Sequence, residues 1–150
     1  MKKTILQLTA VLLLGACAPN QSDTDEQAQE IATDFAEAYF NYDYKTAGKH
    51  STPESEKWLR YAASNVTQAV VDLYNAQEIR ATVEVADFYW TNDTTATVSI
   101  RVSHYVADDS IAAAPRIAEE GLFHLTVVRR DGEMLVRMAS PLRSEKQSRD

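Results

Sequence analysis

The sequence contains few of the residues that build redox, metal and phosphate-binding sites. Its 150 residues include one cysteine, three histidines and four glycines. A single cysteine excludes a disulfide within the chain and a metal centre held by several thiolates. The histidines are scattered without the spacing of metal ligands, and four glycines leave little room for a glycine-rich phosphate loop. We therefore expect neither a metal ion nor another cofactor.

Positive charge is scarce as well. The chain has 15 lysines and arginines against 22 aspartates and glutamates, a formal net charge of −7. Without residues 1–16, which include two lysines and no acidic residue, 13 basic residues remain against 22 acidic ones, a charge of −9. Such a chain repels the phosphates of nucleic acid and the headgroups of anionic lipids. We expect no nucleic-acid partner, and membrane attachment must depend on something other than basic side chains.

The apolar run at residues 5–14 is too short to span a bilayer as a permanent helix. Lys2 and Lys3 precede this run, and it leads into Leu-Gly-Ala-Cys at residues 14–17. This order of charged, apolar and small residues is typical of a secretory signal peptide. The last four residues resemble the lipobox of bacterial lipoproteins, which implies cleavage before Cys17 and lipidation of that cysteine. The alternative is an ordinary secretory signal that happens to contain a cysteine.

We interpret residues 1–16 as a lipoprotein signal peptide and residues 17–25 as the lipidated cysteine with a polar tether. Ala18 rather than aspartate follows the cysteine, which by the same resemblance favours delivery to the outer membrane. The acidic residues within positions 23–26 resemble the short signals that send some lipoproteins to the cell surface, or they cap the next helix. The sequence thus predicts an outer-membrane lipoprotein of the cell envelope, on its periplasmic or its surface face.

Apolar residues at helical spacing predict two long helices and a short one. The first helix is expected from about residue 26, with an apolar side formed by Ile31, Phe35, Ala38, Tyr39 and Tyr42. A short helix is expected within residues 42–50. Thr52 and Pro53 then provide the N-cap and first position of a second long helix. Its expected apolar stripe consists of Trp58, Leu59, Ala62, Val66, Ala69, Val70 and Leu73.

From residue 79 onward the apolar period is two, which is the pattern of half-buried strands. Four strands are predicted, within residues 79–90, 94–106, 121–130 and 133–139. The apolar parity changes after Val85, which predicts a β-bulge. Asn92-Asp93 predicts a tight turn and Asp131-Gly132 a β-hairpin. We predict an α+β domain over residues 26–142, with the helices packed on a curved four-stranded antiparallel sheet, and a frayed charged tail at 143–150.

Residues 32–55 resemble the helical opening of small bacterial lipoproteins in the nuclear-transport-factor-2-like, or cystatin-like cone, superfamily. The matching positions are Ala32, Phe35, Ala38, Asp43, Tyr44, Ala47, Ser51 and Thr52. The ending is similar too, with Arg-Asp-Gly between the last strands and Pro141-Leu142 after them. The resemblance covers about residues 26–142 and implies a cone with a pocket between sheet and helices. Because the superfamily includes isomerases, dehydratases, binding pockets and dimer modules, it selects no function.

A few residues are candidates for the pocket of such a cone. His104 is the one titratable residue in an otherwise apolar row of the second predicted strand: Ala96, Val98, Ile100, Val102 and Val106. It is a weak candidate for a general base or ligand donor, or else a hydrogen-bonded histidine near the strand end. Tyr39, Tyr42 and Trp58 are ligand-binding candidates, or core aromatics. Tyr39 or Tyr42 facing Asp87 would be similar to the tyrosine–acid pairs of ketosteroid-isomerase-like relatives.

The sequence contains no assembled catalytic constellation. We therefore predict a non-catalytic, envelope-anchored lipoprotein that binds a small ligand or a partner protein through its α+β domain. The alternative is a pocket enzyme of the isomerase or dehydratase type that uses His104 and a tyrosine. The two hypotheses differ in whether the His104 ring opens into an apolar cavity with a second polar group in reach.

Overall fold

The structure is a computed structural model and describes residues 20–108 and 114–146. Helices precede strands along the chain, which confirms the predicted α+β class. The elements are α1 (Gln21–Phe40), α2 (Tyr44–Lys49), the 3-10 turn η1 (Pro53–Ser55), α3 (Glu56–Ser64), α4 (Gln68–Ala76), β1 (Thr82–Asn92), β2 (Thr95–Ala107), β3 (Arg116–Arg130) and β4 (Glu133–Arg137). Within these ranges, no helix is both long enough and apolar enough to cross a membrane.

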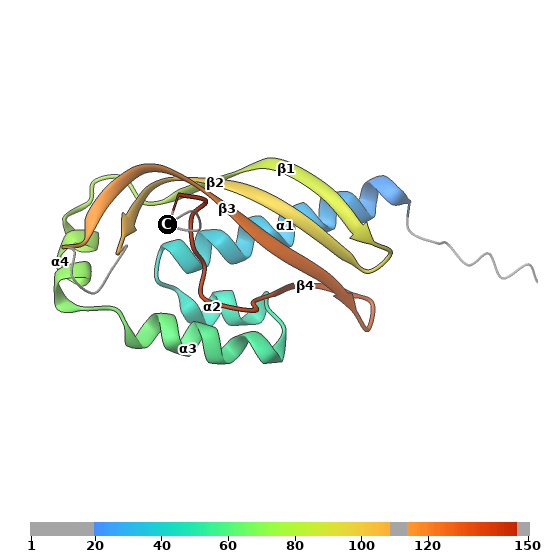
Figure 1. Ribbon diagram of the computed structural model, residues 1–150, viewed down its shortest axis with the longest axis horizontal. Helices are drawn as coiled ribbons and strands as arrows, with labels where there is room; N and C mark the ends of the chain where they lie inside the picture. The colour runs from blue at the N-terminus through green and yellow to red at the C-terminus, as the bar shows by residue number, and fades with distance from the viewer. Residues whose placement is uncertain (1–19, 109–113, 147–150) are drawn as a thin grey trace, which may run out of the picture.

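The four strands form one antiparallel sheet in the order β1-β2-β3-β4, as predicted. The β3–β4 turn has φ values of 52° at Asp131 and 81° at Gly132. Left-handed conformations at both central positions are those of a type I′ hairpin, so the hairpin predicted here is confirmed. The sheet curves over helix α1 (Figure 1).

A β-bulge in β1 keeps its apolar side chains on the helix side of the sheet. The pairing of β1 with β2 shifts between Val85 and Asp87, which confirms the predicted bulge. Val83 and Val85 pack against the core before the shift, whereas Phe88 and Trp90 do so after it. The core itself lies between α1 and the sheet, where Ala28, Ala32, Phe35 and Ala36 meet Val98, Ile100, Val102, Phe123 and Leu125.

Two buried hydroxyl groups join β4 to the helices. Ser55, which is 0% exposed, accepts a hydrogen bond from the Met138 amide (2.9 Å) and donates one to the Val136 carbonyl (3.4 Å). Its oxygen lies 2.9 Å from the Thr52 hydroxyl, and the Thr52 amide also donates to the Val136 carbonyl (2.9 Å). The segment between α2 and α3 is thereby fixed to the last strand.

The prediction of a second long helix is wrong, because the chain forms η1, α3 and α4 instead. The break follows Ser64, where the Ser64 hydroxyl and the side-chain NH₂ group of Asn65 both donate to the Tyr61 carbonyl (2.8 and 2.9 Å). Such local bonds compete with helix continuation. Thr67 then begins α4 as a new N-cap, accepting from the Val70 amide at 3.3 Å. Of the expected stripe, Leu59 and Val70 are buried and Ala69 is exposed.

The predicted boundaries of the domain are also corrected. Helix α1 begins at Gln21, within the proposed tether, and no side-chain capping bond forms at its N-cap Asn20. Asp25 belongs to this helix and accepts a hydrogen bond from the Trp90 indole nitrogen at 2.6 Å. At the other end, the Glu145 amide donates to the Leu122 carbonyl (2.9 Å). Glu145 is therefore held against β3, and residues 147–150 lie outside the described residues.

Candidate functional site

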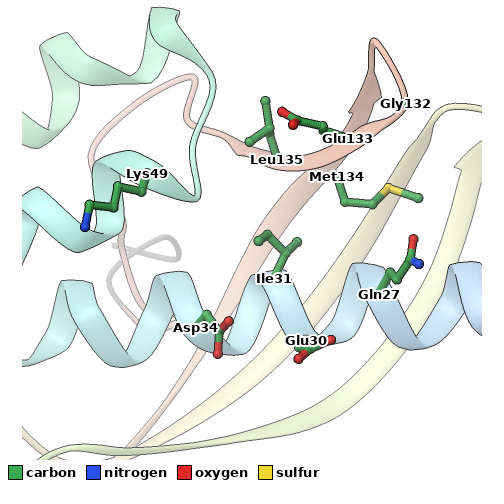
Figure 2. A pocket seen from close by; sticks show the side chains of 9 residues that line it. All are labelled: Gln27, Glu30, Ile31, Asp34, Lys49, Gly132, Glu133, Met134 and Leu135. Atoms are coloured by element: carbon green, nitrogen blue, oxygen red, sulfur yellow. The ribbon is translucent and has the colours of Figure 1, made fainter.

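A groove of about 460 Å³ lies between helix α1 and the β3–β4 hairpin (Figure 2). It is lined by Gln27, Glu30, Ile31 and Asp34 of α1, Lys49 at the end of α2, and Gly132, Glu133, Met134 and Leu135 of the hairpin. In Figure 2 the Ile31 side chain points from α1 toward the hairpin, and Met134 lies across from it. Both side chains are half-buried and pack against the core. They form an apolar floor.

The helical repeat explains the α1 side of this groove. Gln27, Glu30, Ile31 and Asp34 stand at positions i, i+3, i+4 and i+7, which lie on one face of a helix. The opposite wall depends on the type I′ turn, because this turn folds β4 back alongside β3 and toward α1. The groove thus joins two segments about 100 residues apart in the sequence.

The rim of the groove is negatively charged. Its lining includes three carboxylates, those of Glu30, Asp34 and Glu133, and one ammonium group, that of Lys49. Within residues 20–108 and 114–146, none of these four side chains forms an ion pair. Unpaired carboxylates beside an apolar floor suit a ligand with an apolar body and a positively charged group.

A second groove, of about 470 Å³, lies over α2, η1 and α3. Its lining includes Tyr44, Lys45, Leu59 and the pair Glu56 and Arg60. The carboxylate of Glu56 and the guanidinium of Arg60 lie 3.7 Å apart and are both well exposed. These two charges compensate each other, so this groove selects less strongly for the charge of a ligand than the first.

Aromatic rings occupy part of the interior of the domain. Phe40 lies in edge or tilted contact with Tyr39, Tyr105 and Phe123, at centroid distances of 5.2, 5.5 and 4.6 Å. Burial raises the pKa of Tyr39 to about 12, although a hydrogen bond with the Leu142 backbone lowers it in part. Tyr39 is therefore a neutral, packed phenol at physiological pH.

Tyr42 lies at the end of this aromatic cluster with a left-handed backbone, φ 63°. Its ring contacts Tyr44 at 6.1 Å and Tyr74 at 5.1 Å. Burial raises its pKa to about 12, and the neighbouring Asp108 carboxylate adds to the increase. The acid beside Tyr42 is thus Asp108. Asp87, the partner expected from the sequence, is exposed after the bulge in β1.

The prediction that His104 shares the apolar row of β2 is wrong. His104 is exposed and has a left-handed backbone with φ 56°, a conformation that histidine adopts more readily than most residues. The turn of the backbone moves the buried side of the strand from Val102 to Tyr105 and Ala107. The His104 carbonyl accepts a hydrogen bond from the Gln77 side chain at 2.7 Å.

The structure brings together only some of the predicted site residues. Tyr39 and Tyr42 are linked through ring contacts with Tyr44, whereas Trp58 lies on α3 and packs edge-on against Tyr61 at 6.5 Å. Cys17 lies outside the described residues. In the described part of the chain, no group of three or more His, Cys, Asp or Glu side chains is placed to hold a metal ion.

Sequence reasoning missed the residues of the first groove. Glu30 and Asp34 are not among the candidates that the sequence suggested, because they lie outside the apolar side of the first predicted helix. Their spacing from Ile31 was visible, but the opposite wall at Glu133–Leu135 becomes a neighbour only after the hairpin folds onto α1. The one available signal was an acidic helix face interrupted by an isoleucine.

Comparison with known proteins identifies a fold and no function. No family model matches the chain, and no curated protein matches it. Similar solved structures include an NTF-2-like protein of unknown function from Shewanella oneidensis MR-1, with a TM-score of 0.48 and 11% identity over 74% of this chain and 92% of that chain. A variant of Rv3472, a protein of unknown function from Mycobacterium tuberculosis, has a TM-score of 0.51 and 17% identity over 87% of this chain and 78% of that chain.

A third similar structure is described as an NTF2-like protein involved in plasmid conjugation, with a TM-score of 0.35 and 14% identity over 79% of this chain and 48% of that chain. Of the three, we compare folds with the Mycobacterium structure, which has the highest TM-score among them. At 17% identity the likeness shows a shared fold alone.

Proposed function

We propose that this protein is a lipoprotein of the cell envelope whose domain binds a small ligand, without catalysis, in the groove between α1 and the β3–β4 hairpin. The groove carries the proposal, because it combines an apolar floor with unpaired carboxylates at its rim. The envelope location is supported by the sequence of residues 2–17, with its lysines, short apolar run and lipobox-like ending.

The ligand we expect is a small amphipathic cation. Ile31 and Met134 offer it an apolar surface, and the rim offers three negative charges against one positive charge. The acidic composition of the whole chain adds a long-range attraction for cations. An anionic ligand would meet repulsion from both the rim and the rest of the domain.

The alternative from the sequence, a pocket enzyme using His104 and a tyrosine, gains no support from the geometry. His104 is exposed, whereas Tyr39 is largely buried in the aromatic cluster. In the described residues no hydrogen bond joins the His104 ring to Tyr39, Tyr42 or Asp87. A His104→Ala variant that lost a measurable turnover while keeping its fold would reverse this ranking.

Native mass spectrometry of the detergent-solubilised protein, purified from the envelope of cells that make it, tests the groove. Glu30→Gln with Asp34→Asn removes two rim charges at constant side-chain size. Glu78→Gln with Glu119→Gln removes two exposed charges outside the groove and is the matched control. We expect a bound amine on the wild type and the control and its loss from the rim variant. The site is wrong if the wild type carries no small molecule, or if the bound species persists in the rim variant.

The anchor is tested separately with Cys17→Ser. We expect the wild type to partition into the detergent phase and to carry the added mass of acyl chains. The serine variant should move to the aqueous phase. Continued partition of Cys17→Ser into detergent would show that the lipoprotein assignment is incorrect.

A further inference from the structure

One end of the domain combines the start of α1 with two hairpin turns. The first turn of α1, the β1–β2 turn at residues 93–94 and the β3–β4 turn at residues 131–132 lie at the same end, opposite α4 (Figure 1). We call these three segments the turn end. We infer that a lipidated Cys17 holds the turn end against the membrane surface and leaves α4 pointing away from the bilayer. This orientation rests on the lipidation proposed above.

The connection between Cys17 and the folded domain is very short. The Asn20 carbonyl already accepts hydrogen bonds from the Thr24 amide (3.1 Å) and hydroxyl (3.2 Å), so the packed chain begins at Asn20. Ala18 and Pro19 are the only residues between it and Cys17. Three residue steps, even fully extended, span about 11 Å. The lipid therefore cannot lie far from the turn end.

The start of α1 is fastened to the sheet and does not lengthen this connection. The Trp90 indole donates to the Asp25 carboxylate at 2.6 Å, and Thr24 is only 5% exposed. At this end of the sheet, a hydrogen bond from the Arg129 amide to the Thr94 carbonyl (2.7 Å) also joins β3 to the β1–β2 turn. Unwinding the first turns of α1 would break these contacts before it supplied additional length.

The length of α1 separates the two ends of the domain. The helix has 20 residues, which corresponds to about 30 Å. Its C-terminal end leads to Tyr42, whose ring contacts Tyr74 on α4 at 5.1 Å. Because the connection is shorter than this helix, the turn end stays close to the bilayer at every tilt of the domain, whereas α4 comes close only when the domain lies flat on the surface.

The charges of the turn end oppose insertion into the bilayer, so the acyl chains alone would hold this end near the membrane. Its exposed carboxylates are those of Asp23, Asp93 and Asp131, and the exposed Glu26 follows in the next turn of α1. The nearby arginines are already engaged: Arg130 contacts both carboxylate oxygens of Glu54 at 2.9 Å, and Arg129 lies 5.6 Å from the centroid of the Trp90 ring. An acidic surface is repelled by anionic lipids and offers no apolar wedge to neutral ones.

Two single-cysteine variants can measure this orientation, because lipidation consumes the thiol of the one native cysteine. Asp93→Cys places a thiol on the β1–β2 turn, and Asn75→Cys places one on α4; both native residues are exposed. Each full lipidated protein is labelled with the same donor fluorophore and reconstituted in phosphatidylcholine vesicles containing a headgroup-labelled acceptor lipid. Given a connection of about 11 Å and a helix of about 30 Å, we expect at least about twofold higher energy transfer from position 93 than from position 75.

A flexible insertion provides the control. About 20 glycine and serine residues between Pro19 and Asn20 should free the domain and equalise transfer from the two positions. If the unlabelled wild-type chain does not sediment with vesicles, the proposed lipidation is wrong. If it sediments but position 75 transfers as strongly as position 93, the anchor is present and the inferred orientation is overturned.

Discussion

Ser55→Ala tests the idea that buried hydroxyl groups hold β4 against the helices. The Ser55 oxygen is 0% exposed and accepts the Met138 amide at 2.9 Å, so alanine leaves a buried N–H group without its partner. An unsatisfied buried donor costs about 1–3 kcal/mol, and the lost contact with Thr52 adds to it. We therefore expect Ser55→Ala to lower the free energy of unfolding by about 2–3 kcal/mol.

Urea unfolding of the Cys17→Ser chain, followed by tryptophan fluorescence, measures this loss. A loss of this size corresponds to a melting temperature lower by about 6–9 °C for a domain of this length. Ser64→Ala is the matched control, because the Ser64 hydroxyl forms its hydrogen bond on the exposed surface. A double-mutant cycle with Thr52→Val should give a coupling of about 0.5–1.5 kcal/mol. Equal stability of Ser55→Ala and Ser64→Ala would refute the reasoning.

Three further predictions follow from contacts in the core and at its edges. Trp90→Phe removes the indole donor to Asp25 and should destabilise the domain by about 1–3 kcal/mol in thermal unfolding. The double variant Asp25→Asn/Trp90→Phe should lose little more stability than Trp90→Phe, and a much larger loss would contradict this explanation. Gly121→Ala would place a methyl group in steric conflict with the Tyr105 hydroxyl and should cost about 1–3 kcal/mol. Gly48→Ala in helix α2, with Leu59 at 3.7 Å, should instead be neutral or stabilising. The pKa of Tyr39 and of Tyr42 is about 12 in the folded protein, above the ordinary 10.0, so folding favours the protonated phenols. The resulting stability is complete below about pH 10 and is lost as the pH rises toward 12. Absorbance titration at alkaline pH and unfolding experiments at the same pH values can check this.

Features that depend on short stretches of sequence were predictable. The change in the parity of apolar residues at Val85 indicates the bulge, because alternate side chains of a strand must keep one face of the sheet buried. Asp131-Gly132 predicts the hairpin, because both residues tolerate the left-handed conformation that a type I′ turn requires. The order of the strands follows from these short connections, since consecutive antiparallel strands pair as neighbours.

Features that depend on competition or on distant contacts were not predictable in the same way. The break before α4 reflects the polar side chains of Ser64 and Asn65, which compete for the Tyr61 carbonyl, whereas the apolar spacing continued past them. The left-handed backbone at His104 cannot be recognised from the alternation of apolar and polar residues in β2. The groove needs Met134 to fold back onto Ile31, a neighbourhood created by the tertiary structure.

The hydrogen bond between the Glu145 amide and the Leu122 carbonyl covers part of an edge of the sheet that would otherwise be exposed. Strand β4 covers β3 only between Thr126 and Arg130, so the earlier part of β3 would otherwise present unpaired backbone groups. Exposed edges of this kind recruit strands from other chains and promote aggregation. The hydrogen bond from the Glu145 amide, together with the Glu145–His124 contact at 2.9 Å, places a polar segment over part of that edge. The segment around Glu145, predicted from the sequence to be a frayed tail, thus covers part of an edge to which a strand of another chain could otherwise add.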